Sequence, residues 1–179
     1  IVDSYHDSMW DIDKDISFTA GEERENSKKR IQEWHYVFPK ATVLTGNHDQ
    51  RVSRKAMKSG ISTDYLRSWN EILDISDDDW EFLYEKEINN VLYRHGDSGH
   101  AFLRCQKERQ SVVQGHFHTL GYVQWSTSRK DSIFGMQVGC GIDAEAEAFE
   151  YGKRYAKRPT IGCGVVLDSG TRPSFIKKI

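Results

Sequence analysis

The chain has 179 residues, a formal net charge of −2 and 37% hydrophobic residues, with a mean hydropathy of −0.68. This length fits one domain with a real core, and the 12% of aromatic residues argues against an intrinsically disordered chain. The small negative charge gives no global electrostatic case for a nucleic-acid-binding protein, and no apolar run approaches the length of a membrane span.

The three cysteines, Cys105, Cys140 and Cys163, lack the short spacing of a metal site. An odd number of cysteines in an ordinary domain indicates reduced thiols, so we expect a cytoplasmic protein. The chain begins at Ile1 rather than at a methionine, and we therefore expect it to start inside a longer protein.

The first predicted helix follows a polar, acidic loop over residues 4–18. Thr19 and Glu22 have the spacing of a capping box, which predicts a helix start near Ala20. Apolar residues then recur at helical spacing and predict a buried face, until Pro39 ends the helix. These apolar residues are Ile31, Trp34, Val37 and Phe38.

Alternating strands and helices follow. A short buried strand is predicted over residues 41–44, followed by a turn at Gly46 and a helix over residues 48–58. Residues 65–73 predict an amphipathic helix in which Trp69 is a core anchor. Further along the chain we expect a strand over residues 87–93, a short helix over residues 102–105 and a strand over residues 111–114.

Hairpins dominate the last third of the chain. Residues 122–125 and 132–138 flank one polar turn, and residues 162–167 and 174–179 flank another, so each pair predicts antiparallel strands. Between the hairpins, residues 143–151 predict a helix rich in Ala and Glu. This order of elements predicts one α/β domain, residues 1–179, with a mixed sheet or a pair of sheets and helices outside.

The Gly-Asn-His-Asp sequence at residues 46–49 carries side chains suited to metal binding and proton transfer. Asn47 offers a neutral carbonyl oxygen to a divalent ion at the end of the predicted strand. His48 is then available to contact a substrate, and Asp49 can orient its imidazole and favour the protonated form. The start of the following helix, where Arg51 lies, can present backbone N–H groups to a phosphate.

Two further motifs also follow predicted strands. His116 and His118 are separated by one residue, so they point to the same face of a strand or reach two adjacent metals from a loop. His95 lies between a predicted strand and a glycine. Taken alone, the His-x-His pair is as compatible with a surface loop as with a metal site, and a single histidine more often has a structural role.

The three motifs occur in the order found in calcineurin-like metallophosphoesterases, which this chain resembles. Gly-Asn-His-Asp comes first, then a strand ending in His95, then Gly-His-Phe-His at residues 115–118. The extended motif at residues 46–51 is similar to that of members from phages and prophages, which implies a bacterial or phage-infected host cell. The resemblance also implies a fold of two mixed β-sheets packed face to face with helices outside, an αββα sandwich.

The resemblance further implies the role of each residue. His48 would stabilise the transition state or protonate the leaving group, with Asp49 as its partner. Two divalent ions would activate a hydroxide that attacks a phosphomonoester or phosphodiester. Mixed nitrogen and oxygen ligation favours a transition metal, manganese first, with iron, zinc, nickel or magnesium as alternatives. The implied metal ligands are Asn47, His95 and His116 for one ion and His118 for the other.

One part of the family pattern is not found in full. The family's Asp-x-His and Gly-Asp-x-x-Asp motifs supply an Asp that bridges the two metals, and residues 1–3 fit only the end of the second motif. We therefore expect the bridging Asp just before Ile1. Asp3 is a candidate partner of the metal ligands, whereas His6 and Asp7 are best interpreted as solvated loop residues.

Three functions stay open at this point. The leading expectation is a metal-dependent phosphoesterase acting on a small or flexible phosphoester, with no membrane partner. Arg51, Arg54 and Lys55 beside the first motif keep a DNA or RNA nuclease as an alternative. A catalytically impaired protein-binding scaffold of the same fold is the third, although a scaffold has no need of His48 and Asp49.

Overall fold

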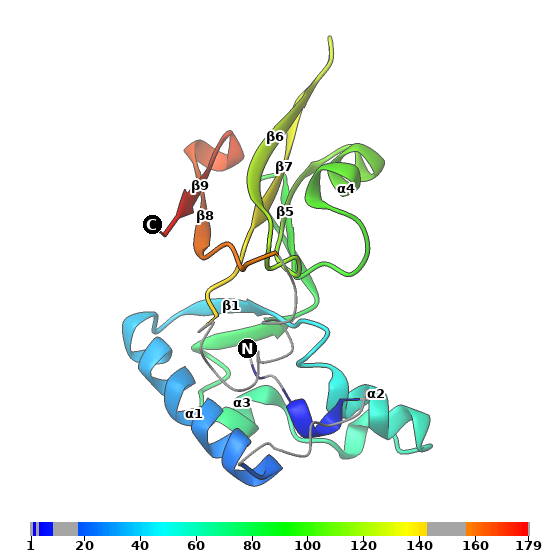
Figure 1. Cartoon of the computed structure of the whole chain (residues 1–179), viewed down its shortest axis with the longest axis vertical. Helices are drawn as coiled ribbons and strands as arrows, with labels where there is room; N and C mark the ends of the chain where they lie inside the picture. The colour runs from blue at the N-terminus through cyan, green and yellow to red at the C-terminus, as the bar shows by residue number, and fades with distance from the viewer. Residues whose placement is uncertain (1, 3, 9–17, 143–156, 179) are drawn as a thin grey trace. The chain divides into compact units, whose positions relative to one another are not determined.

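The computed structural model describes residues 2, 4–8, 18–142 and 157–178. The predicted helix over residues 143–151 and the candidate residue Asp3 lie outside these described residues. The chain divides into two units, Ile1–Leu83 and Tyr84–Ile179. In the described residues this mixed α/β protein has four α-helices, one five-stranded mixed sheet and two small two-stranded sheets, without a closed barrel (Figure 1). None of the described helices is long and apolar enough to cross a membrane.

The first unit contains a pair of short parallel strands that pack with two helices. Ala41 of β1 lies opposite Trp80 of β2 in a parallel register. Ile31 of α1 and Leu73 of α3 join the core around these strands. The elements are η1 (Tyr5–Asp7), α1 (Ala20–Val37), β1 (Ala41–Leu44), α2 (Arg51–Lys58), η2 (Thr63–Tyr65), α3 (Trp69–Leu73) and β2 (Trp80–Leu83).

Helix α1 begins where the sequence predicts. The Thr19 hydroxyl accepts the N–H of Glu22 at 3.2 Å, and the Glu22 carboxylate accepts the N–H of Thr19 at 2.8 Å, so the capping box is confirmed. The predicted buried face is wrong in part, because only Ile31 of its four apolar residues is buried. Trp34 and Phe38 stack on each other, with ring centroids 5.8 Å apart, instead of entering the core. The exposed members are Trp34 (58%), Val37 (64%) and Phe38 (51%).

Two predicted helices of this unit have different bounds. The helix expected over residues 65–73 is split, because the Ser68 hydroxyl accepts the N–H of Glu71 in a second capping box that starts α3. Helix α2 starts at Arg51 rather than at residue 48, since residues 47–50 form turns. Trp69 packs against the core and stacks on Phe82, with centroids 6.4 Å apart, which confirms it as a core anchor. Strand β2 was not expected from the sequence.

The second unit is built on the five-stranded sheet, with strand order β3-β4-β5-β7-β6. Strands β4, β5 and β7 are parallel in the centre, and β3 and β6 pair antiparallel at the two edges. The elements are β3 (Glu85–Ile88), β4 (Val91–Arg94), α4 (Ala101–Glu108), β5 (Ser111–Gln114), β6 (Gly121–Thr127), β7 (Ser132–Val138), β8 (Gly162–Leu167), η4 (Asp168–Gly170) and β9 (Arg172–Lys177).

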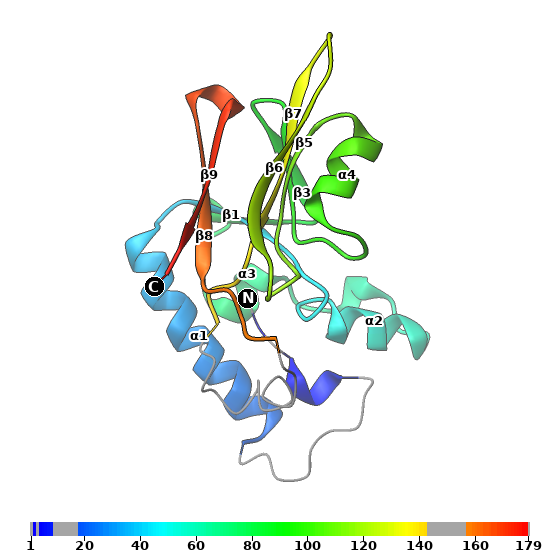
Figure 2. The same ribbon diagram turned by 45° about the horizontal axis from the view of Figure 1, so that its top comes forward.

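The two faces of this sheet are covered by different elements. Helix α4 lies on one face and the β8–β9 hairpin on the other (Figures 1 and 2). Cys105 of α4 packs with Val112 and Ile133 on the first face. On the second face Val166 of β8 packs against a cluster that includes Phe134. The sheet is therefore buried on both sides, as parallel sheets generally are.

The predicted hairpins of the second unit are confirmed, and one segment predicted as a single strand forms two strands. Strands β6 and β7 pair in register, as do β8 and β9. The strand expected over residues 87–93 is instead the β3–β4 hairpin, which turns at Asn89 and Asn90. These residues have φ angles of 50° and 61°, and asparagine tolerates this left-handed region better than most residues. The Asn-Asn pair is therefore a turn signal within an otherwise strand-like sequence.

Candidate metal centre

His95 and His116 lie side by side in the second unit. Strands β4 and β5 are parallel and in register, with Arg94 opposite Gln114, so the loops that follow them start at the same edge of the sheet. His116 Nδ1 lies 3.3 Å from His95 Nε2, and the two rings are nearly perpendicular, with centroids 5.3 Å apart. Both side chains are half-buried. Parallel pairing has thus brought together two predicted metal ligands from separate motifs.

The distance between the two nitrogens fits two ligands of one ion. Metal–nitrogen bonds of about 2.0–2.1 Å in a tetrahedral site place two ligand nitrogens about 3.3–3.4 Å apart. In the metal-free protein the same distance suits a hydrogen bond from one ring to the other. Imidazole nitrogen is a good ligand for zinc, iron and nickel, so the donor set fits a transition metal. Within the described residues of this unit, no third His, Cys, Asp or Glu completes a metal-binding group with the pair.

His116 lies at the centre of a tight backbone turn. Its φ angle is 67°, and the N–H of Phe117 donates to the carbonyl of Gly115 at 2.8 Å. A non-glycine residue in this region is strained, and such strain persists only where the surrounding structure holds it. The turn directs the His116 side chain away from the regular path of β5, toward His95.

Three buried polar side chains lie at the ends of the central strands, next to these loops. Gln137 donates through Nε2 to the Gly115 carbonyl and accepts the N–H of Ala101 at 3.2 Å. Gln114 donates to the carbonyl of Gly99 at 2.9 Å, and Arg94 lies 3.5 Å from the Asp97 carboxylate. None of the three was a predicted site residue. Their signal in the sequence is a polar residue at or near the end of an otherwise apolar strand.

Asp97 is held in its ionised form by the loop that follows His95. The backbone N–H of Ser98 donates to its carboxylate and lowers the pKa of Asp97 below its ordinary value, and Arg94 and Arg104 lower it further. Arg104 Nη2 lies 2.9 Å from Asp97 Oδ1. This network ties the His95 loop to α4 and to the end of β4.

His118, the predicted ligand of a second ion, lies two residues after His116 in the same loop. Its backbone carbonyl accepts the N–H of Thr160 at 2.7 Å, and the Cys140 thiol lies 3.7 Å from the same oxygen. These contacts fasten the loop to the segment before β8. The role of the His118 side chain as a metal ligand stays a prediction.

Asn47, His48 and Asp49 belong to the first unit, where Asp49 organises the motif. Asp49 is 6% exposed, and its two carboxylate oxygens accept the N–H groups of Val2 at 2.9 Å and Gly46 at 2.7 Å. It therefore closes the turn after β1 and attaches the start of the chain to it. Its predicted role as the partner of His48 stays a prediction.

Arg51, the predicted substrate-binding residue, lies beside His48. Arg51 Nη2 is 3.4 Å from His48 Nε2. Arg51 opens a stripe of basic residues at helical spacing on α2, which has no acidic residue. This stripe, called the α2 basic stripe below, consists of Arg51, Arg54, Lys55 and Lys58.

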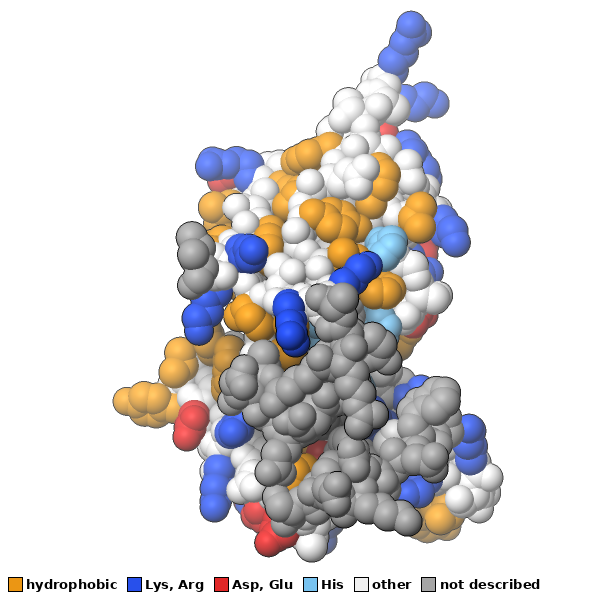
Figure 3. All heavy atoms as spheres, viewed as in Figure 1, with side chains coloured by type: hydrophobic (Ala, Val, Ile, Leu, Met, Phe, Trp, Pro, Cys, Tyr) orange, Lys and Arg blue, Asp and Glu red, His pale blue; other side chains and the backbone are white. Residues whose placement is uncertain are grey.

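Like Arg51, the next members of the stripe have internal partners. The Arg54 guanidinium donates to the carbonyl of Asn47, and Lys55 lies 3.2 Å from the carboxylate of Asp7. The stripe thus supports the motif at residues 46–49 as well as carrying charge. On the face shown in Figure 3, Lys and Arg side chains are scattered rather than gathered in one continuous patch.

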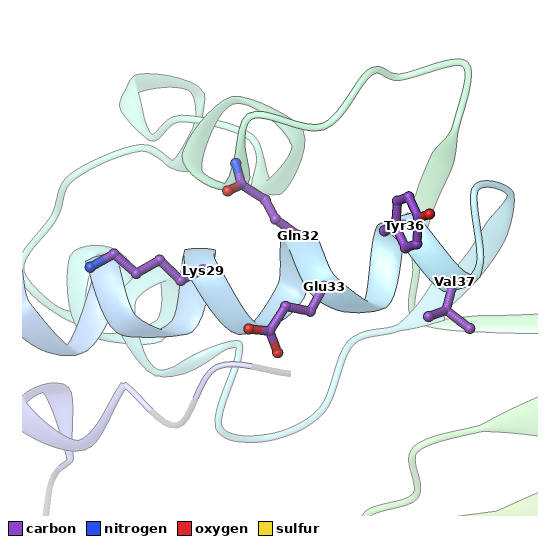
Figure 4. A pocket seen from close by; sticks show the side chains of 5 residues that line it. All are labelled: Lys29, Gln32, Glu33, Tyr36 and Val37. Carbon is purple, nitrogen blue, oxygen red and sulfur yellow. The ribbon is translucent and has the colours of Figure 1, made fainter.

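A shallow surface hollow runs along one side of α1, and no predicted site residue lines it. Figure 4 shows the side chains that line it, and all of them come from this helix. They are Lys29, Gln32, Glu33, Tyr36 and Val37. A hollow along a single helix, without converging polar groups, does not have the form of a catalytic pocket.

Comparisons with protein-family models, with curated proteins and with solved structures found no match to this chain. The resemblance to metallophosphoesterases therefore rests on residues 46–49, 95–97 and 115–118 and on their order in the sequence.

Proposed function

We propose that this chain is a metal-dependent phosphoesterase domain that hydrolyses a phosphomonoester or a phosphodiester. The observation that carries the proposal is the 3.3 Å separation of His116 Nδ1 and His95 Nε2 at the ends of neighbouring parallel strands. Ligands of α/β proteins generally bind at this edge of a parallel sheet. Two half-buried imidazoles at ligand spacing in that position support a metal centre.

The proposed ligand set joins this pair to residues that only the motif resemblance supplies. His95 and His116 hold one divalent ion, to which the resemblance adds Asn47, and His118 belongs to a second. Bound ions supply Lewis acidity, lower the pKa of water and neutralise charge on the phosphoryl group. Manganese is the first choice, with iron, zinc, nickel or magnesium as alternatives.

The other motif residues act on the substrate. His48 donates a proton to the leaving-group oxygen or hydrogen-bonds to the phosphoryl group. Arg51 beside it offers a planar guanidinium that matches two phosphate oxygens. Asp49 holds the turn in which His48 lies, through its hydrogen bonds to the N–H groups of Gly46 and Val2.

The proposal also includes the finer fold of the family, with two β-sheets packed face to face and helices outside. Its support is the packing of Val166 of β8 against Phe134 and Met136 of the five-stranded sheet, opposite the face that α4 covers. A sheet with a helix on one face and strands on the other is half of such an αββα arrangement.

Two substitutions test the separate roles of metal ligand and proton donor. With manganese added, the protein should cleave p-nitrophenyl phosphate or bis-p-nitrophenyl phosphate. His116→Ala should lose both metal and turnover, whereas His48→Ala should lower kcat by about 10²–10⁴ and keep the metal content. His35→Ala is the matched control, because His35 contacts Asp79 and has no proposed role. Unchanged metal binding in His116→Ala would refute the proposed centre.

A nuclease is the second candidate, and the α2 basic stripe favours it. Cations at helical spacing beside His48 suit a substrate with several phosphates, whereas a small phosphomonoester needs only one such contact. Binding of single-stranded DNA should then weaken with salt, with a slope of about −0.7 for each phosphate contacted. The double variant Arg54→Gln/Lys55→Gln should reduce that slope by about 1.4, and Lys29→Gln on α1 should leave it unchanged. If binding of single-stranded DNA did not change with salt, the nuclease candidate would be excluded.

A further inference from the structure

A row of three polar side chains crosses the centre of the five-stranded sheet where one face is otherwise apolar. Arg94 of β4 lies opposite Gln114 of β5, and Gln114 lies opposite Gln137 of β7. Their exposed fractions are 8%, 1% and 0%. We call these residues the polar row.

The row continues a hydrophobic face of the sheet. Side chains two residues apart on a strand share a face, so Gln114 follows Val112 and Gln137 follows residues 133 and 135. Val112 and Ile133 pack with Cys105 of α4. Apolar side chains would extend that packing without the penalty of burying amide and guanidinium groups. Core packing alone therefore does not explain why these three positions are polar.

The reason lies in what the row contacts. Gln137 donates to the Gly115 carbonyl, the same oxygen that accepts the Phe117 N–H at 2.8 Å in the turn around His116. Gln114 donates to the Gly99 carbonyl at 2.9 Å, and Arg94 contacts Asp97 at 3.5 Å. Each member thus holds the loop of either His95 or His116.

In the part of the chain that the structure describes, two members of the row keep a buried polar atom unsatisfied, whereas Gln137 has a partner for both ends of its amide. Within the described residues, Arg94 Nε and Gln114 Oε1 are buried without a hydrogen-bond partner. Such atoms are destabilising, and natural proteins retain few of them. Gly96, next to His95, also packs so closely on Gln114 that an added Cβ would lie 2.6 Å from its side chain.

We propose that the polar row positions the His95–His116 pair, and that Gln137 is the residue that holds His116 in its left-handed turn. The inference rests on the proposed function, in that the pair is taken as a metal site. Gln137 is a positioning residue, since it contacts the backbone of the His116 loop and not the imidazole. Without its hydrogen bond, the strained turn at His116 keeps only the Phe117 N–H on the Gly115 carbonyl, and the imidazole no longer meets His95.

The test compares Gln137→Met with Gln124→Met in the full chain. Both variants make the same change, but Gln124 is exposed on the neighbouring strand β6. In metal-free protein, NMR should show a cross-peak between the ring protons of His95 and His116 that Gln137→Met loses and Gln124→Met keeps. A cross-peak between Trp125 and Phe134, whose centroids are 5.3 Å apart, reports that the sheet is intact. Zinc affinity, measured by chelator competition, should fall by about 10–100-fold in Gln137→Met alone.

The outcomes separate this inference from the proposed function. If Gln137→Met folds and keeps both the histidine cross-peak and the zinc affinity of Gln124→Met, the positioning role is wrong. If wild-type protein binds no metal but Gln137→Met still loses the cross-peak, the positioning role is supported and the phosphoesterase proposal is refuted. Should Gln137→Met fail to fold, Gln114→Met on β5 tests the same positioning role. This variant should displace the His95 loop and so also lose the histidine cross-peak. Retention of the cross-peak there would also overturn the inference.

Discussion

Replacing Gly96 by alanine should destabilise the second unit through two separate effects. Gly96 has a φ angle of 98°, and an added Cβ would lie 2.6 Å from Cγ and Cδ of Gln114. The left-handed backbone costs an alanine about 1–2 kcal/mol. Displacing the buried Gln114 adds about 1–3 kcal/mol, as in other overpacked cores. The sum of about 2–5 kcal/mol is a large part of a typical domain stability of about 5–15 kcal/mol.

Gly99→Ala separates the two effects, because Gly99 lies in the same loop. Its φ angle is 79°, but nothing lies within 4 Å of an added Cβ, so only the backbone penalty applies. Urea unfolding followed by tryptophan fluorescence gives both free energies. With an m-value of about 2 kcal/mol/M, an extra 2 kcal/mol in Gly96→Ala lowers the midpoint by about 1 M relative to Gly99→Ala. Equal midpoints would show that Gln114 is not held beneath the His95 loop.

Three further predictions concern caps, charge and thiols. Thr19→Ala removes a hydroxyl acceptor at the start of α1 and should lower the free energy of unfolding in urea by about 1 kcal/mol; no change would mean that the capping box contributes nothing. The pKa of Asp97 is lowered in the folded state, chiefly by the Ser98 N–H. The ionised carboxylate therefore stabilises the fold fully above an unfolded pKa of about 3.9, and this stabilisation is lost as the pH falls through the lower pKa of the folded state. Wild-type protein should therefore lose stability relative to Asp97→Asn in acid urea titrations below about pH 4, and parallel curves would contradict this. A disulfide reagent at pH 8 should modify the exposed Cys163 rapidly and Cys105, whose pKa burial raises, only on unfolding; mass spectrometry of the labelled peptides distinguishes them.

Local signals in the sequence predicted several elements well, and the misses have local causes too. The Thr19–Glu22 capping box and the late hairpins were found because their signals lie within a few residues of one another. The missed break before α3 is the same kind of signal, Ser68–Glu71, hidden by an apolar pattern that continues across it. The β3–β4 turn was missed because Asn89 and Asn90 interrupt a strand-like run without glycine or proline.

Burial was harder to predict than secondary structure. Trp34 and Phe38 have the spacing of a buried helical face, yet they stack on each other at the surface. Helical period shows which residues share a face, but not whether a neighbouring element covers it. In the same way, a glutamine near the end of a strand does not reveal on its own that Gln137 is fully buried.

The sequence by itself determined which side chains could carry chemistry, because the motifs at residues 46–49, 95–97 and 115–118 are runs of a few residues whose donor atoms can be read directly. Only the tertiary structure decided that His95 and His116, 21 residues apart, meet at 3.3 Å, since this depends on the parallel register of β4 with β5. It also revealed the polar row, whose members come from three strands and are neighbours only through their cross-strand pairing. Contacts between distant residues follow from strand order and register, which short motifs do not specify.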